Sequence, residues 1–316
     1  MIKETMGANM GVGTRNGEPK RELTFKKMDA FATERSSGNP AGYIRLDSLA
    51  DISDAEMLQI AKELKGFVNE VGYMSEISER FFDLRYFSSE REVDFCGHAT
   101  VAIMYDLIKN DENLQKFDEL HIRTNSGTLS VENRISREDA VFIMSPAPVH
   151  KTVSLDASTI AEKLKIKPEE IDTDYPISVI NAGLSTLLVP IKTLESILAI
   201  LPDLEELKQF CFDSGIDIIE VFTHDVADER NHFRTRVFAG TFGYLEDPAT
   251  GTGNSALGYY AMKNGLWKNE TIMIEQNGLK DRFNLIKLQK KRDEKGNDRV
   301  LFGGGAITRI DGKYMI

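Results

Sequence analysis

Hydrophobic and polar residues alternate along much of the chain, in a pattern that predicts many strands and few helices. In the first part of the chain, strands are predicted over residues 23–33, 37–46, 66–77 and 82–88. Between the second and third of them, Ser53 and Glu56 form a capping box, which an apolar stripe with helical spacing follows. Residues 98–110 are apolar nearly all round, which predicts a helix buried on every side.

The second part of the chain repeats this order at a separation of about 150 residues. Its predicted elements are a strand, turn and strand over 177–191, strands over 216–224 and 234–240, and a helix over 254–265. Strands in such close succession favour an α+β fold with mixed or antiparallel sheets over a doubly wound parallel sheet. Each apolar helix is then expected inside its own half, wrapped by a curved sheet.

The repeat predicts two domains, and a hydrophobic fraction of 41% in 316 residues is ample for their cores. We place the first domain at residues 23–147, with a strand at 306–316 as a candidate for completing it, and the second at 148–305. Residues 1–22 are polar and lack periodicity, so we expect them to form a loose extension.

Charge and cysteine content narrow the functional classes. The net charge is −11, and no run rich in Lys and Arg is flanked by aromatic residues, so nucleic acid is not an expected partner. No segment approaches the roughly 18 uninterrupted apolar residues of a membrane span. Two cysteines in a chain of this length do not make a disulfide framework, which favours the reducing cytoplasm.

Two glycine turns carry the candidate chemistry: "DFCGHAT" at 94–100 and "EDPATGTGNSA" at 246–256. Each ends a predicted strand and opens a predicted helix. The N-terminus of a helix has unpaired N–H groups and a partial positive charge, and glycine lets a ligand approach that backbone closely. Gly97, Gly251, Thr252 and Gly253 would then bind a carboxylate from both sides of a cleft between the domains. The alternative is that both segments are only tight turns.

Several motifs in this order resemble the phenazine-biosynthesis PhzF-like family, from residue 23 to the end. They are "MDAFAT…GNPAGYI", "NEVGYM", "LRYFSSEREVDFCGHATVA", "EDPATGTGNSALGYY" and "FGGGAI". The resemblance implies a fold similar to that of diaminopimelate epimerase. That fold has two pseudo-symmetric halves, each a curved, barrel-like sheet around a central helix.

The same comparison explains why it matters that only one of the two glycine turns has a cysteine. Two-base epimerases and racemases of that fold have one cysteine in each glycine turn. Here the first turn has Cys96, whereas the matching position of the second turn is Thr250, which is no proton-abstracting base at neutral pH. A proton transfer on one face of the substrate therefore fits better than epimerisation by two thiols.

The resemblance also implies the acid and base residues. A glutamate moves the proton in PhzF-like isomerases, and the matching position is Glu70, whose pseudo-equivalent in the second half is Glu220. His98 and Asp247 are implied as its catalytic helpers. Asn39, in "GNPA", is expected to line the cleft or to fix its loop.

We therefore expect a cofactor-independent isomerase acting on a small carboxylate, similar to trans-2,3-dihydro-3-hydroxyanthranilate isomerase. The remaining histidines show no metal-ligand spacing, so no metal is expected. A homodimer is implied by the resemblance alone. The alternatives are an amino-acid epimerase or racemase that uses Cys96, and a binding protein without catalysis.

Overall fold

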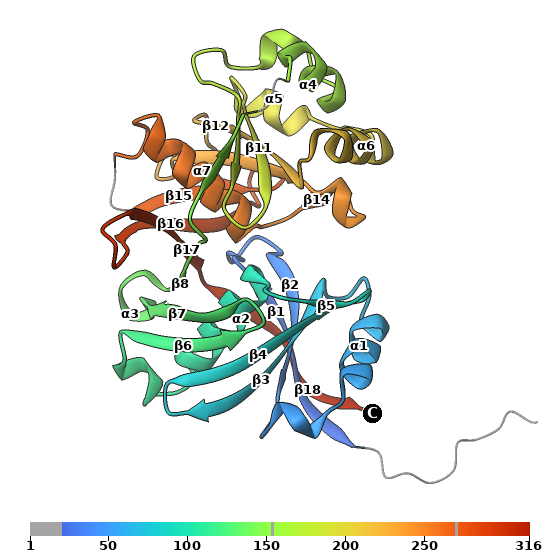
Figure 1. The fold of residues 1–316 in the computed structure, drawn as a ribbon, viewed down its shortest axis with the longest axis vertical. Helices are drawn as coiled ribbons and strands as arrows, with labels where there is room; N and C mark the ends of the chain where they lie inside the picture. The colour runs from blue at the N-terminus through green and yellow to red at the C-terminus, as the bar shows by residue number, and fades with distance from the viewer. Residues whose placement is uncertain (1–20, 153–154, 269–270) are drawn as a thin grey trace, which may run out of the picture.

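The computed structural model describes residues 21–152, 155–268 and 271–316 (Figure 1). The extension expected over residues 1–22 therefore lies, except for its last two residues, outside the described part of the chain. Strands and helices form two halves that lie one above the other in Figure 1. We call the part around helix α2 the first half and the part around helix α7 the second half.

The first half is a curved mixed sheet that surrounds α2 (Gly97–Lys109). Its strands are β1 (Glu22–Ala30), β2 (Asn39–Arg45), β3 (Glu70–Ser78), β4 (Phe81–Ser88), β5 (Glu92–Val93), β6 (Glu119–Thr124), β7 (Gly127–Asn133) and β8 (Val141–Met144). The pairs β2–β3 and β4–β6 are parallel, and the other pairs among these strands are antiparallel. Helix α1 (Asp54–Glu63) begins at the predicted capping box, and α3 (Ile135–Glu138) is a single turn.

The second half repeats this arrangement around α7 (Gly251–Lys263). Its strands are β9 (Val149–Lys151), β10 (Ser178–Asn181), β11 (Ser185–Pro190), β12 (Ile218–Thr223), β13 (Phe233–Phe238), β14 (Glu246–Asp247), β15 (Thr271–Gln276), β16 (Asn284–Arg292) and β17 (Asp298–Gly304). The parallel pairs β11–β12 and β13–β15 correspond to β2–β3 and β4–β6. Helices α4 (Ala157–Leu164), α5 (Leu194–Ala199) and α6 (Leu204–Ser214) pack on the other face of this sheet.

Both central helices are buried as the sequence predicts, and glycine in the sheet makes room for α2. Residues 99–108 of α2 are all buried. A Cβ atom on Gly72 of β3 would lie only 2.3 Å from Cδ1 of Ile103, so glycine lets the helix pack closely against the strand here. The buried helix and the curved sheet together confirm the predicted α+β fold.

Two predicted boundaries are wrong. The strand predicted from residue 66 begins at Glu70, because the chain turns first through Gly66, whose φ is +81°. The helix predicted from residue 254 begins at Gly251, so both glycines of "TGTG" lie in its first turn. Glycine has low helix propensity, which hid this turn from the sequence pattern.

Phe302 of β17 explains why both turns carry glycine next to the helix start. A Cβ atom on Gly97 would lie 3.1 Å from Cζ of this ring, and one on Gly251 would lie 2.3 Å from its Cδ2. The first residues of α2 and α7 therefore pack on one buried aromatic ring, and the two helices are in contact. Larger side chains at either position would push the two helix N-termini apart.

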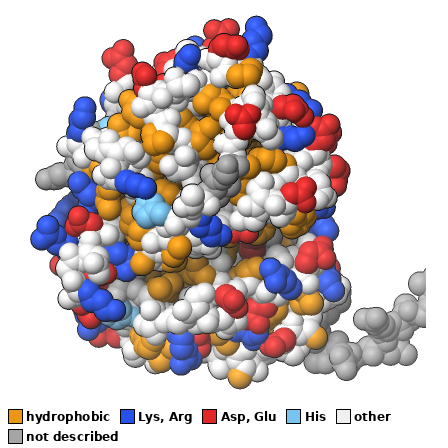
Figure 2. Space-filling view, turned by 45° about the horizontal axis from the view of Figure 1, so that its top comes forward, with side chains coloured by type: hydrophobic (Ala, Val, Ile, Leu, Met, Phe, Trp, Pro, Cys, Tyr) orange, Lys and Arg blue, Asp and Glu red, His pale blue; other side chains and the backbone are white. Residues whose placement is uncertain are grey.

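The last two strands connect the halves. Strand β17 of the second half pairs with β8 of the first, and β18 (Ala306–Met315) returns to pair with β1 along its whole length. Figure 1 shows β18 beside β1 in the lower half. No helix of the described residues is long and apolar enough to span a membrane. On the face in Figure 2, acidic and basic side chains are interspersed.

Candidate active site

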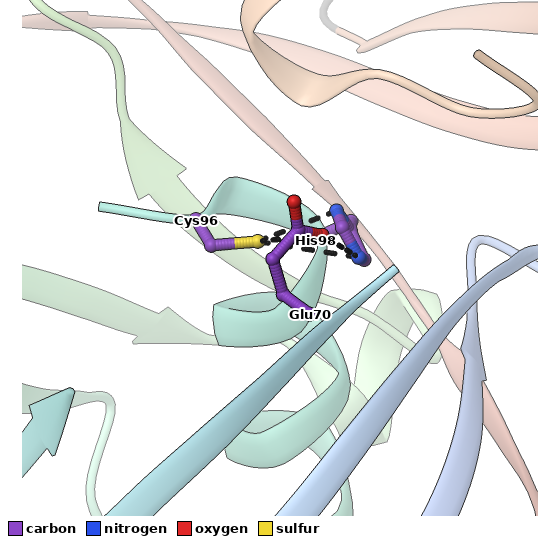
Figure 3. Close-up of side chains that lie close together, drawn as sticks. All are labelled: Glu70, Cys96 and His98. Atoms are coloured by element: carbon purple, nitrogen blue, oxygen red, sulfur yellow. Dashed lines mark hydrogen bonds and ion pairs between the residues drawn. The ribbon is translucent and has the colours of Figure 1, made fainter. Parts of the chain in front are cut away.

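Three side chains meet where β3 begins and α2 begins (Figure 3). Glu70 is the first residue of β3, Cys96 is the N-cap of α2, and His98 is the second residue of that helix. Oε2 of Glu70 lies 3.3 Å from Nε2 of His98 and 3.9 Å from Sγ of Cys96. The Glu70 side chain keeps 22% of its surface exposed, so it can reach a bound molecule.

Burial sets the proton affinity of Glu70 near that which acid–base catalysis needs, keeps His98 uncharged and raises the pKa of the Cys96 thiol. Burial, together with the negative charge of Asp247, raises the pKa of Glu70 to about 7. Burial lowers the pKa of His98 to about 4, although a hydrogen bond to the Pro40 backbone opposes this. At neutral pH His98 is therefore an uncharged hydrogen-bonding partner, while Glu70 can both accept and release a proton.

Asp247 approaches the trio from β14 of the second half. Its Oδ1 accepts hydrogen bonds from Nδ2 of Asn39 at 2.8 Å and from the backbone N–H of Ala249 at 3.2 Å. Burial raises the pKa of Asp247 to about 6, against the lowering effect of hydrogen bonds from Thr250 and Ala249. The charge of Asp247 thus adds to the cost of ionising Glu70, so the two carboxyl groups are electrostatically linked across the halves.

Asn39 links the first half to the second through side-chain hydrogen bonds. Its Nδ2 donates to Asp247 and to the Ala249 carbonyl at 2.9 Å, and its Oδ1 accepts from Asn69 at 2.7 Å. Only 1% of Asn39 is exposed. With its side chain committed to these partners, Asn39 positions Asp247 and does not project into solvent where a substrate would lie.

The second glycine turn places backbone donors beside Asp247. Gly251, Thr252 and Gly253 form the first turn of α7, and its N-cap, Thr250, makes no capping hydrogen bond to them. Thr250 is held instead by Gln276, whose Oε1 accepts from its backbone N–H at 3.0 Å. The first-turn N–H groups can therefore donate hydrogen bonds to an anion, in the field of the helix dipole.

Comparison with known proteins supports the expectation from the motifs. The model of the PhzC-PhzF family, phenazine biosynthesis-like proteins, matches residues 28–312. The chain belongs to this family. An uncharacterised isomerase of Bacillus subtilis, YfhB, is 30% identical over 260 residues, which cover 81% of this chain and 86% of that protein. An uncharacterised isomerase of Clostridium acetobutylicum is 26% identical over 94% of this chain and 99% of its own.

Solved structures show the same fold. The PhzF-family protein of Bacillus anthracis superposes with a TM-score of 0.81 at 23% identity, covering 94% of this chain and 100% of its own. A hydroxyproline epimerase of Agrobacterium vitis superposes with a TM-score of 0.54 at 12% identity, covering 94% of this chain and 92% of its own. The predicted family and epimerase-like fold are confirmed, and so is the enzyme class, an isomerase.

In this PhzF-family chain, Glu220 is the glutamate of the second half that the sequence pattern pairs with Glu70. It is the third residue of β12, whereas Glu70 is the first residue of β3, and the strand registers match Glu220 to Gly72 instead of Glu70. Glu220 is also completely buried. Neither of its carboxyl oxygens has a hydrogen-bond partner among the described residues. A Cβ atom on Gly253 would lie 3.0 Å from its Oε2, so the first turn of α7 packs against Glu220. The structure thus offers only Glu70, of these two glutamates, to a substrate.

The buried Glu220 predicts an unusual dependence of stability on pH. Burial, and then the charge of Asp247, raises its pKa well above the ordinary 4.5. The folded chain therefore keeps a proton that the unfolded chain releases, and the free energy of unfolding falls as pH rises above that value. The loss is up to about 1.4 kcal/mol per pH unit until the folded-state pKa is reached.

Replacing Glu220 with glutamine should remove this loss. We expect the variant to gain stability over the wild type at pH 8 and to differ much less at pH 5, as measured by urea unfolding. Glu229→Gln, an exposed position of the same half, is the control and should show no such difference. An effect of equal size at both pH values would contradict a protonated Glu220.

Three supporting residues were missed by the sequence analysis of the site. They are Asn69, which orients Asn39; Gln276, which holds the second turn; and Phe302, which separates the helix starts. Asn69 is the first residue of the family motif "NEVGYM", whereas Gln276 lies outside the predicted elements and carries no local signal. Phe302 lies in the family motif "FGGGAI", and that was the only hint of its importance.

Proposed function

We propose that this enzyme moves a proton between two carbon atoms of a small carboxylate substrate, with Glu70 as the acid and base. One observation carries the proposal. Of the two glutamates that the sequence pairs, Glu70 and Glu220, Glu70 alone is partly exposed, next to His98, and has a pKa of about 7. A group with that proton affinity both takes and gives a proton at neutral pH.

The steps follow from the positions of the groups. The Glu70 carboxylate removes a proton from carbon, and the electron pair of the broken C–H bond moves into the adjacent unsaturated system. Glu70, now a carboxylic acid, returns its proton to a second carbon on the same face. Nε2 of His98, which is uncharged, lies 3.3 Å from Oε2 of the reacting carboxyl and keeps this group oriented.

The second half supplies substrate binding in this proposal. The N–H groups of Gly251, Thr252 and Gly253 receive the substrate carboxylate, and Gly97 adds the opposite helix start. Asp247, whose charge acts on Glu70, can hold a substrate amine or hydroxyl. The chemistry needs neither a redox cofactor nor a metal, because each bond made and broken exchanges only a proton.

Exchange with solvent deuterium tests the proposal directly. Proton NMR in D₂O would follow a panel of small carboxylates with the wild-type enzyme. The panel includes trans-2,3-dihydro-3-hydroxyanthranilate, diaminopimelate, proline and several unsaturated amino acids. We expect isomerised product or deuterium on carbon for an unsaturated carboxylate. Binding of a panel member without any exchange would favour the non-catalytic alternative.

The pH profile of turnover gives a second test. Because the base form of Glu70 is needed, kcat/KM should rise about tenfold per pH unit below about pH 7 and level off above it. Asp247 raises the pKa of Glu70, so Asp247→Asn should shift the midpoint of the normalised profile to lower pH, whatever its effect on the maximal rate. An unmoved midpoint would show that the titrating group is not Glu70.

A further inference from the structure

The carboxylate, thiol and imidazole of the site also make a ligand set for a metal ion. One donor atom from each of Glu70, Cys96 and His98 can be chosen so that all three lie within 4.8 Å of one another. Figure 3 shows the three side chains converging from β3 and from the start of α2. Glu70 and Cys96 are 26 residues apart, which is why no metal-binding motif appears in the sequence.

The separations match one face of a zinc tetrahedron. Zn²⁺ binds sulfur at about 2.3 Å and nitrogen or carboxylate oxygen at about 2.0–2.2 Å, which puts neighbouring ligand atoms about 3.4–3.6 Å apart. Nε2 of His98 lies 3.3 Å from Oε2 of Glu70, and Sγ of Cys96 lies 3.9 Å from that oxygen and 4.0 Å from Nε2. Adjustments of a few tenths of an ångström would therefore complete the coordination.

The donor types and charges select the metal. A thiolate and an imidazole favour Zn²⁺ over the hard cations Mg²⁺ and Ca²⁺, which prefer oxygen ligands. With a thiolate, a carboxylate and a neutral imidazole, the complex carries no net charge. Neutrality suits a site where only 12% of the His98 side chain and 8% of Cys96 are exposed.

We propose that Glu70, Cys96 and His98 bind a single Zn²⁺ ion, and that this ion inhibits the enzyme by occupying the Glu70 carboxylate. Coordination replaces the thiol proton of Cys96 by a sulfur–zinc bond and releases that proton to solvent. The fourth position remains open to water. Binding of the ion does not depend on the proposed function, whereas inhibition rests on Glu70 being the base.

Binding is tested first with the full chain freed of metal by a chelator. Calorimetric titration with Zn²⁺ should give one site, and Co²⁺ in its place should give the intense absorption of cobalt bound to a thiolate. Cys96→Ser should weaken Zn²⁺ binding by at least about 100-fold and remove the cobalt–thiolate band. Cys211→Ser, which removes the other buried thiol on α6, is the control and should bind like the wild type.

Several outcomes would overturn the site. They are no stoichiometric binding by the wild type, a cobalt spectrum without thiolate absorption, or the same loss in Cys211→Ser as in Cys96→Ser. The cobalt spectrum of the wild type tests the site without any substitution, so it remains valid even if a variant fails to fold. Circular dichroism of each variant identifies such a failure.

Inhibition is tested with the substrate found by deuterium exchange. Turnover should fall in proportion to the fraction of enzyme carrying Zn²⁺ and recover when a chelator removes it. Zinc bound through Cys96 without inhibition would refute Glu70 as the base and leave the metal site standing. Zinc-insensitive turnover without metal binding would refute the site and leave the proposed function standing.

Discussion

Replacing Glu70 with glutamine is expected to lower the rate of proton transfer by a factor of about 10²–10⁴, the usual contribution of a general acid–base group. Glutamine keeps the size of the side chain and its ability to hydrogen-bond His98, but it cannot carry the proton. The fold and the binding of a substrate carboxylate at α7 should therefore persist. The measurement is deuterium incorporation and product formation by NMR, with substrate binding followed separately.

The matched control lies on the same strand. Glu76 is exposed on β3, where its carboxylate pairs with Arg45 at 3.6 Å, so Glu76→Gln makes the same chemical change away from the site. This variant should turn over like the wild type. Exchange that survived in Glu70→Gln would refute Glu70 as the base. The neighbouring thiol, whose Sγ lies 3.4 Å from Nδ1 of His98, would then be the next base to test, by Cys96→Ser.

A single methyl group on Gly251 is expected to damage both stability and activity. The new Cβ would lie 2.3 Å from Cδ2 of Phe302 and 2.4 Å from its Cε2, so the buried ring or the helix start must move. Overpacking of this kind costs about 1–3 kcal/mol of the free energy of unfolding. A shift of about 1 Å in the α7 cradle can cost a further factor of about 10² in turnover.

Urea unfolding and kcat/KM of Gly251→Ala measure the two effects. Gly312→Ala on β18 is the control, because no heavy atom lies within 4 Å of its new Cβ. Alanine favours helix over glycine, so any loss in Gly251→Ala comes from packing and not from helix propensity. Adding Phe302→Leu should recover part of the stability. Wild-type stability in Gly251→Ala alone would contradict the close approach of helix and ring.

The sequence was sufficient to predict features that depend on residues close together in the chain. The buried helices α2 and α7 follow from their apolar composition, and α1 begins at the capping box of Ser53 and Glu56. The family motifs led to Glu70, His98 and Asp247, and the structure places Glu70 and His98 in contact. Among the described residues, the Asp247 side chain accepts hydrogen bonds from Asn39, Ala249 and Thr250, and none from His98 is present.

Features that depend on contacts between residues far apart in the chain could not be predicted from the sequence. Glu70 and Glu220 sit in similar local sequences, and only the packing of Gly253 against Glu220 distinguishes the buried carboxyl from the accessible one. The hydrogen bond from Asn39 to Asp247 joins residues 208 positions apart. Such pairings arise from the closing of the two halves, which no local pattern of hydrophobic residues encodes.

The pairing of β18 with β1 has a consequence for folding during synthesis. Strands β17 and β18, which follow all the other described strands along the chain, close both open edges of the first half, at β8 and at β1. During synthesis the first half therefore has two unpaired strand edges until β17 and β18 have been made, although its other strands are made first. Exposed edges invite pairing with other chains, so this is the stage at which the protein is most vulnerable to aggregation and most in need of chaperones.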